Sequence, residues 1–279
     1  MHRPLQIGDL RPDVPDARLG RRVYVFDSVD STNTFLLSQP GEHGDGALAS
    51  AEFQSAGRGR LGRPWQAPRG SSLLLSFLLI EPPGSPLLDA APLLAAVAIC
   101  EAIEDETDVR PAVRWPNDVT VAGRKLGGVL VESTPLGAPA KATPVAFPVE
   151  STPPPTDGGA RAIVVGVGLN CLQQAGHFPP ELSGKATSLE IESAAPVDRP
   201  LLARRLVTRL DARVRAPLAT TRQAWRERCE DLGQSVRLLR GGREFAGSVV
   251  DVDAEGDLMV ELASGGRRRF ESATTTRLW

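Results

Sequence analysis

The side chains best suited to chemistry gather in one glycine- and arginine-rich stretch, residues 52–69. Glycines alternate with arginines there, and a tryptophan closes the run: Gly57, Arg58, Gly59, Arg60, Gly62, Arg63 and Trp65. Glycine lets the backbone approach a ligand closely, and arginine presents a rigid fork of donors that suits carboxylate and phosphate oxygens. Because residues 58–69 contain four arginines and no acid, we expect a bound anion to order the segment 57–65, called here the arginine loop.

A solvated basic surface loop, or an RGG-like segment that binds nucleic acid, has the same composition. The position of the stretch in the chain favours a ligand-binding loop instead. Residues 51–54 have the pattern of a strand end, and residues 71–80 are almost continuously apolar, which is typical of a buried strand. We therefore interpret the arginine loop as a binding loop held between two core strands.

Two further polar stretches accompany strand or helix ends. The run Asp30-Ser31-Thr32-Asn33 precedes a helix expected at 34–38, and it has more polar groups than one helix cap needs. The sequence alone leaves open whether the excess faces a ligand. Further along, Pro116 marks a strand end and presents Asn117 and Asp118 at a turn, a position that these two residue types also favour on structural grounds alone.

Glycines mark two strands expected in the core. Lys125 lies at the bend of a hairpin over 119–132, and Gly127-Gly128 follow in its buried second strand, which suggests a close backbone approach. The strand 162–170 carries Gly166-x-Gly168. This is half of a dinucleotide-binding fingerprint without the third, helix-opening glycine, so we reject a Rossmann site.

The composition limits the class of protein. The 279 residues carry a formal net charge of −2, which argues against general attraction to nucleic acid or to membranes. The longest apolar helix candidate, 90–100, is too short to span a bilayer. Three widely spaced cysteines without a signal peptide indicate reduced thiols, so we expect a cytoplasmic protein.

Three successive regions are expected along the chain, and the second of them contains an insertion. Residues 1–22 mix Pro, Arg, Asp and Gly and predict a loosely held arm, and residues 23–232 contain expected strands together with helices, including a core helix at about 89–104. Residues 133–160 contain seven prolines and predict a flexible insertion between two paired strands. From 233 to 279, short strands alternate with glycine turns, as in a small SH3-like β-barrel. The predicted class is α+β.

Taken together, these segments resemble the biotin protein ligases. The residues that carry the resemblance are Asp30-Ser31-Thr32-Asn33, Gln54 to Trp65, Trp115-Pro116-Asn117-Asp118, Lys125 to Glu132, and Gly166-Val167-Gly168-Leu169-Asn170. They occur in the family's order, and their combination is highly specific. Many members have Lys before Trp-Pro-Asn-Asp where this chain has Arg114, which keeps the charge.

The resemblance implies a class II synthetase-like catalytic domain, built as a mixed β-sheet backed by helices, that binds biotin and ATP and is followed by the SH3-like domain. It implies two steps: biotin and ATP with Mg²⁺ give biotinyl-5′-AMP, and a lysine of a biotin carboxyl carrier protein domain, part of a biotin-dependent carboxylase, then takes the biotinyl group. Regulatory members carry an N-terminal DNA-binding unit. The 22 residues before Val23 are too few for one, so we expect a biotin–[acetyl-CoA-carboxylase] ligase that binds neither DNA nor a membrane.

The resemblance also assigns site residues. Those expected to bind biotin are Ser31, Thr32, Gln54, Gly57, Arg58, Lys125 and Gly128. Those expected to bind ATP or the adenylate are Asn33, Arg60, Arg63, Trp65, Asn117, Asn170 and Arg277. Those expected to act in catalysis are Arg58, Arg60, Lys125 and Asp118. The three cations would neutralise a carboxylate and a phosphate that otherwise repel each other, and Asp118 would either steer the incoming lysine or hold a turn.

Two other functions stay open at this point. A lipoate–protein ligase shares the fold and the adenylate chemistry but lacks this arginine loop. A non-enzymatic module that binds nucleotides or RNA could use the basic loop and the barrel. Mg²⁺ often binds through substrate phosphates, so the sequence names no ligands for it.

Overall fold

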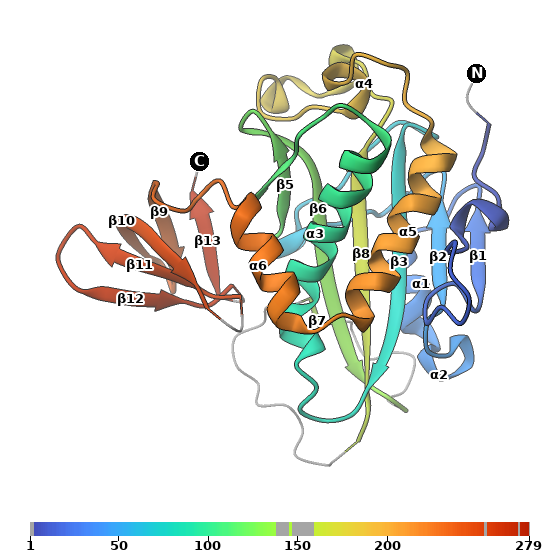
Figure 1. Cartoon of the computed structure of the whole chain (residues 1–279), viewed down its shortest axis with the longest axis horizontal. Helices are drawn as coiled ribbons and strands as arrows, with labels where there is room; N and C mark the ends of the chain where they lie inside the picture. Colours follow the sequence, from blue (N-terminus) through green and yellow to red (C-terminus); the bar gives the residue numbers. More distant parts are fainter. Residues whose placement is uncertain (1–2, 138–144, 147–158, 254–255, 273, 279) are drawn as a thin grey trace.

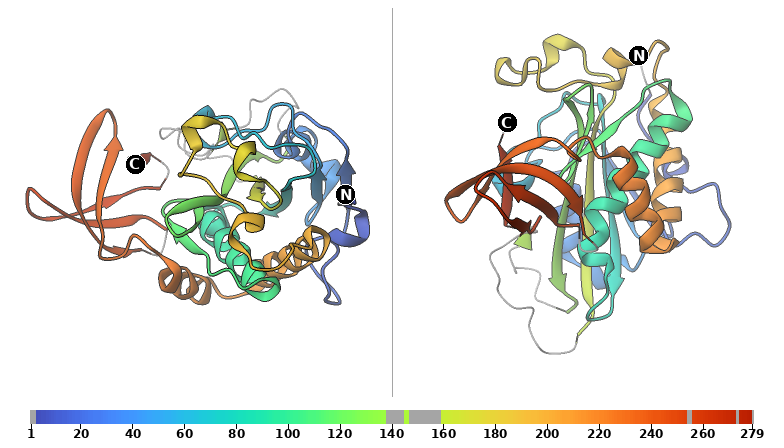
Figure 2. Two further views of the ribbon diagram at one scale, coloured as in Figure 1. Left: turned by 90° about the horizontal axis from the view of Figure 1, so that it is seen from above. Right: turned by 60° about the vertical axis from the view of Figure 1, so that its left-hand side comes forward.

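The computed structural model describes residues 3–137, 145–146, 159–253, 256–272 and 274–278. A large sheet forms the centre of the molecule and a smaller sheet stands to one side of it (Figure 1). Figure 2 shows the smaller sheet projecting away from the large one when the molecule is turned. The predicted fold class, a mixed sheet backed by helices with a small C-terminal β-domain, is confirmed.

The large sheet has the strand order β1-β2-β3-β8-β6-β5-β4. In that order the strands are Val23–Phe26, Leu48–Ala51, Ser72–Glu81, Arg161–Asn170, Arg124–Pro135, Asp118–Val121 and Ala112–Arg114, and the short β7 (Val145–Ala146) pairs with β6. The first pair is parallel and the other neighbours are antiparallel. The register of the central pair places Gly128 opposite Gly168 and Leu130 opposite Gly166.

Helices cover both faces of the large sheet. Its helices are α1 (Thr32–Ser38), α2 (Pro40–His43), α3 (Leu87–Glu106), α4 (Leu189–Glu192), α5 (Arg199–Arg215) and α6 (Leu218–Arg228), with short 3₁₀ turns η1 (Ile7–Leu10), η2 (Arg60–Gly62), η3 (Ala175–His177) and η4 (Pro180–Leu182). Leu73, Leu75, Phe77 and Leu79 of β3 pack in the core formed by α3 and α5, whereas Leu78 packs in the separate cluster with α1. Burial on both faces explains the continuous apolar run.

The expected core helix is present as α3, and the helix expected at residue 34 begins two residues earlier, at Thr32. It begins there because Ser31 adopts an extended conformation and its side chain accepts the N–H of Thr34. Among the described residues, no helix combines the length and the apolar content needed to cross a bilayer.

The C-terminal sheet has the order β12-β11-β10-β9-β13 and is antiparallel throughout. Its strands, in chain order from β9 to β13, are Ser235–Arg240, Arg243–Val252, Leu258–Leu262, Arg267–Phe270 and Thr275–Leu278. The last strand returns to pair with the first one. Buried apolar side chains of this sheet, such as Leu238 and Phe270, belong to the same hydrophobic cluster as α3 and α5.

The insertion expected at 133–160 lies between β6 and β8, which pair as predicted. Its first residues differ from the prediction, because β6 continues through Pro135, which lies opposite Arg161. The stretches 138–144 and 147–158 lie outside the described residues.

The prediction of a loosely held N-terminal arm is wrong for the described residues. Leu5, Leu10 and Leu19 are each at most 4% exposed and belong to the main core. The N–H of Leu19 also donates to Asp211 of α5, at 2.9 Å. The arginines and prolines between these leucines concealed an apolar set that packs against α5.

Truncation of this segment should therefore destabilise the fold. Leu10→Ala removes a side chain that is 1% exposed, and we expect it to lower the free energy of unfolding by about 2–5 kcal/mol. Ile7→Ala, in the same turn but 48% exposed, is the control and should change it by less than about 0.5 kcal/mol. Urea unfolding followed by circular dichroism measures both, and equal small effects would show that the arm is loosely held after all.

Candidate active site

A cavity of about 570 Å³ lies over the ends of β6 and β8 that carry their glycines. The predicted site residues that line it are Ser31, Thr32, Asn33, Gln54, Arg58, Arg60, Arg63, Trp65, Asn117, Asp118, Lys125, Gly128, Asn170 and Arg277. Gly57 is the predicted site residue that does not line it. Its carbonyl accepts the N–H of Trp65 at 2.9 Å, and a Cβ on Gly57 would lie 2.6 Å from the Trp65 carbonyl oxygen. Gly57 therefore allows the arginine loop to close on itself.

The glycines of β8 make room for side chains from other elements. A Cβ on Gly166 would lie 2.4 Å from Oδ1 of Asn33, and a Cβ on Gly168 would lie 2.6 Å from the Trp65 ring. Real Cβ atoms do not approach other atoms so closely. The absent side chains thus let Asn33 of α1 and the Trp65 indole lie directly on the sheet, which is the reason for the Gly-x-Gly pattern.

The arginine loop forms a small hairpin, with Gly59 N–H donating to the Arg63 carbonyl at 2.7 Å. Its first arginine is held by a carboxylate of the protein itself. Nη2 of Arg58 lies 3.1 Å from Oε1 of Glu132, and Nη1 donates to Oγ1 of Thr34 at 2.9 Å. Glu132, on β6, is only 1% exposed. We expected a bound anion to order this loop, and for Arg58 the protein supplies one.

A line of buried polar side chains continues from Glu132 along α1. Asn33 donates through Nδ2 to Oε2 of Glu132 at 2.7 Å, and Ser76 donates to Oδ1 of Asn33 at 2.6 Å. Oγ1 of Thr32 lies 2.6 Å from Oγ of Ser76, and the Thr32 N–H donates to Oε1 of Gln54 at 2.8 Å. Asn33 therefore lies beside Thr32, among the groups expected to contact biotin, although it was expected to contact the adenylate.

Lys125 and Asp118 form an ion pair at 2.6 Å between Nζ and Oδ1. The ammonium group also lies 5.8 Å from the centre of the Trp65 ring. The backbone of Lys125 is paired with a distant segment: its N–H donates to the Lys185 carbonyl at 2.7 Å, and its carbonyl accepts the N–H of Thr187 at 2.8 Å. This bridge brings the segment 171–188 to the cavity.

Arg60 reaches from the arginine loop to the C-terminal sheet. Its Nη1 donates to Oδ1 of Asn117 at 3.3 Å, and its Nη2 donates to the carbonyls of Ser272 at 2.6 Å and Thr275 at 3.3 Å. All three acceptors are neutral. Burial lowers the pKa of the Arg60 guanidinium to about 10, partly offset by the Asp118 carboxylate. An anion in the cavity would therefore compensate the charge of the Arg60 guanidinium better than these neutral acceptors do.

Two other residues of the cavity wall, Asn170 and Arg277, form hydrogen bonds or ion pairs with neighbouring residues. Asn170 donates to the Thr187 carbonyl at 3.0 Å and accepts from Gln173 at 2.9 Å. Arg277 forms an ion pair with the buried Asp231 at 2.9 Å, and burial raises the pKa of the Asp231 carboxyl despite the pairing.

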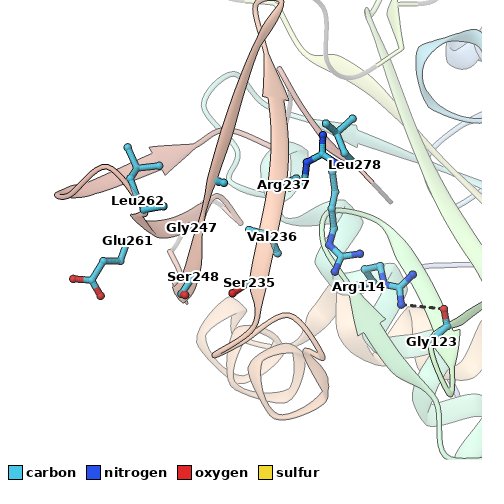
Figure 3. A pocket seen from close by; sticks show the side chains of 13 residues that line it. Arg114, Gly123, Ser235, Val236, Arg237, Gly247, Ser248, Glu261, Leu262 and Leu278 are labelled. Carbon is cyan, nitrogen blue, oxygen red and sulfur yellow. Dashed lines mark hydrogen bonds between the residues drawn. The ribbon is translucent and has the colours of Figure 1, made fainter.

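Arg114 forms an ion pair with Glu230 and donates to the Gly123 carbonyl at 3.0 Å. It thereby ties the β4–β5 hairpin to the end of α6. Arg114 and Arg277 also line a second cavity of about 750 Å³ between this hairpin and the C-terminal sheet (Figure 3). The two arginines therefore form part of the wall between the two cavities.

Sequence reasoning missed several residues of the site. Part of the cavity wall comes from the segment 171–188: Gln173, His177, Phe178, Glu181, Leu182 and Lys185. That stretch has no periodic pattern, and its place is revealed by tertiary contacts, namely the backbone bridge to Lys125 and the hydrogen bonds to Asn170. Ser76 and Glu132 lie beneath the cavity, and each had a signal in the sequence: Ser76 interrupts an apolar run, and Glu132 is an acid directly after one.

A methyl group on β8 should move the Trp65 ring. Gly168→Ala would place a Cβ 2.6 Å from that ring, so we expect the indole to leave the sheet, its fluorescence to shift to longer wavelength and stability to fall by about 1–3 kcal/mol. Gly176→Ala, where nothing lies within 4 Å, is the control. The shift should vanish in a Trp65→Phe background, and a shift that persists there would show that another tryptophan reports it.

Comparison with known proteins identifies relatives. Residues 25–145 match the model of the Biotin/lipoate A/B protein ligase family, and residues 231–274 match that of the Biotin protein ligase C terminal domain. The biotin--[acetyl-CoA-carboxylase] ligase of Mycobacterium tuberculosis is 32% identical over 97% of this chain and 94% of its own length. The bifunctional ligase/repressor BirA of Escherichia coli is 30% identical over 87% of this chain and 70% of its own.

The match to the Bacillus subtilis ligase/repressor BirA, at 27% identity, spans 82% of this chain and 65% of that protein. Among solved structures, the biotin protein ligase of Aquifex aeolicus in complex with biotin and ATP superposes with a TM-score of 0.72 at 24% identity, over 92% of this chain and 99% of that one. At this identity the superposition shows a shared fold.

Proposed function

The chain belongs to the biotin protein ligase family, and on that premise we propose that it joins biotin to a carrier protein at the expense of ATP. The observation that carries the proposal is the convergence, in one cavity, of the arginine loop, the start of α1, the Asn117-Asp118 turn and Lys125. The first three segments are well separated in the chain, and Lys125 follows the Asn117-Asp118 turn on the next strand. Their donors, acceptors and cations match a small ligand that has a polar ring, a carboxylate and a phosphate partner.

The reaction has two steps in this proposal. A carboxylate oxygen of biotin attacks the α-phosphorus of ATP, and the bond to the leaving pyrophosphate breaks, which gives biotinyl-5′-AMP. The amine of a carrier lysine then attacks the acyl carbon, AMP leaves, and the amine loses a proton. The carrier is a biotin carboxyl carrier protein domain of a biotin-dependent carboxylase, in keeping with the name of the M. tuberculosis relative.

The cations of the cavity would act in the first step. A carboxylate and an α-phosphate repel each other as they approach, and fixed positive charges in a partly desolvated site lower that barrier. We assign this role mainly to Arg58 and Lys125, each of which is also paired with a carboxylate of the protein, whereas Arg60 would mainly hold the adenylate in the closed loop. Asp118, which holds Nζ of Lys125 at 2.6 Å, is in a position to attract the ammonium group of the incoming lysine before it loses its proton.

Ser31, Thr32, Gln54 and Gly128 would surround the biotin ring system, and Gly57, which does not line the cavity, would shape the arginine loop beside it. Its ureido group needs both donors and acceptors, because burial would otherwise leave its desolvation uncompensated. Asn117, Asn170, Arg63, Trp65 and Arg277 would contact the nucleotide. In this proposal the catalytic domain is 23–232 and the C-terminal domain is 233–279.

Mg²⁺ would enter with the nucleotide, since this ion keeps several waters and binds largely through substrate phosphates. Within the described ranges, no group of three or more His, Cys, Asp or Glu side chains is arranged to hold a metal. We therefore name no protein ligand for it, and the ion would supply neutralisation of phosphate charge.

The substrate can be identified by pyrophosphate release. We expect the purified chain with ATP and Mg²⁺ to release pyrophosphate when biotin is added, and to label a carrier domain when that is added too. Lipoate in place of biotin is the matched comparison. Release with lipoate alone would identify a lipoate ligase, and no release with either would identify a binding module.

Two variants should separate formation of the adenylate from its retention. Arg60→Gly removes contacts that close the loop over the cavity, so it should still release pyrophosphate but lose its adenylate about 10–100 times faster, the effect of one charge-assisted contact of about 1.5–3 kcal/mol. The escaped adenylate should then biotinylate serum albumin. Lys125→Ala should abolish adenylate formation itself.

Arg69→Gly is the control for these variants, because Arg69 pairs with the exposed Asp27 and does not line the cavity. It should behave as the unmodified chain. If Arg60→Gly labels albumin no more than Arg69→Gly does, the role given to Arg60 is wrong.

A further inference from the structure

The hydrogen bonds along the line of buried side chains beneath the cavity have a defined donor-to-acceptor direction, and Asn33 sets it. Its Nδ2 lies 2.7 Å from Oε2 of Glu132 and 3.3 Å from the carbonyl of Leu130. The carbonyl can only accept, and the Glu132 carboxylate, which is paired with the Arg58 guanidinium, also accepts. The amide of Asn33 must therefore present its nitrogen to these two oxygens and its Oδ1 to the opposite side.

Ser76 lies on that opposite side and is fully buried. A serine hydroxyl has one proton, and the 2.6 Å contact with Oδ1 of Asn33 uses it. The oxygen of Ser76 is then left as an acceptor, facing Oγ1 of Thr32 at 2.6 Å. Two oxygens this close need a proton between them, so Thr32 must donate its own proton to Ser76.

Thr32 is thus left with no proton for the cavity. Oε1 of Gln54 lies 3.1 Å from Oγ1 of Thr32 and already accepts the Thr32 N–H. The proton of Thr32 cannot serve both oxygens well, and the shorter contact with Ser76 requires it. This end of the cavity therefore presents two acceptor oxygens, and it is complemented by a ligand that brings an N–H.

We propose that Glu132 and Ser76 are specificity-determining positioning residues: through Asn33 and Thr32 they make this end of the cavity an acceptor that selects a ligand N–H. The inference rests on the proposed function, in which that donor is one ureido N–H of biotin. Glu132 does not line the cavity. It acts indirectly, by fixing which of its neighbours donates and which accepts in each hydrogen bond. The charge of the buried Glu132 carboxylate fixes these hydrogen-bond directions, and the ion pair with Arg58 compensates that charge.

Two variants should relax the selection. In Ser76→Ala the acceptor for the Thr32 proton is gone, so Thr32 can turn its hydroxyl toward the cavity. In Glu132→Gln the side chain can donate to Oδ1 of Asn33, so only the longer 3.3 Å contact with the Leu130 carbonyl still opposes a turned Asn33 amide and a reversed line of hydrogen bonds. Ser50→Ala is the matched control, because Ser50 is an equally buried serine of the same sheet. It donates to the Leu74 carbonyl and takes no part in the line of hydrogen bonds from Glu132 to Thr32.

The test compares biotin with the two cyclic carbamates in which one or the other ureido N–H is replaced by oxygen. Binding to the full-length protein is measured by calorimetry without ATP. For one of the two carbamates we expect the unmodified chain to bind about 10–100 times more weakly than biotin, because two acceptors then face an oxygen. Ser76→Ala and Glu132→Gln should reduce that ratio about tenfold, while Ser50→Ala leaves it unchanged.

The ratio separates selection from a merely structural role, since a general loss of fold or affinity weakens both ligands alike. If Ser76→Ala keeps the ratio of the unmodified chain, or if Ser50→Ala changes it equally, the inference is wrong, and this holds even if Glu132→Gln fails to fold. If the unmodified chain does not bind biotin at all, the proposed function fails instead.

Discussion

The site depends on the need to compensate one buried charge. Glu132 follows three apolar residues of β6 and is almost fully buried, and such a carboxylate is unstable unless cations and hydrogen-bond donors surround it. The compensation comes from Arg58 of the arginine loop and Asn33 of α1. One carboxylate therefore fastens a loop and a helix to the sheet, and it does so at the floor of the cavity.

The two faces of the large sheet serve different purposes. The face covered by α3 and α5 is packed with leucine, valine and phenylalanine side chains and contributes most of the core. On the face that carries α1, glycines of β8 leave space for Asn33 and Trp65. That face keeps a smaller apolar cluster around Leu78 and also contains a polar cavity, whose buried floor is stabilised by hydrogen bonds among Asn33, Ser76 and Glu132.

The C-terminal sheet completes the wall of the cavity. Consecutive acids at the end of α6, Glu230 and Asp231, pair with Arg114 of β4 and Arg277 of β13. Arg60 adds a third connection through the carbonyls of Ser272 and Thr275. Because Arg60 belongs to the loop that covers the cavity, loop and C-terminal sheet are held in one network. A ligand phosphate that draws Arg60 inward would have to compete with those carbonyls.

The sequence by itself determined what depends on local pattern. The continuous apolar run of β3, the glycine turns of the C-terminal sheet and the basic loop can each be recognised from residue types a few positions apart. So can most residues of the cavity, because they cluster in short motifs. The tertiary structure alone decided what those residues touch. Asn33 and Glu132 meet across 99 positions of sequence. The segment 171–188 is held at the cavity by a backbone bridge to Lys125 and by hydrogen bonds to Asn170. The leucines of the N-terminal segment are buried because distant elements such as α5 pack against them. Such contacts depend on which faces of distant elements pack together, and no local propensity of the chain encodes that choice.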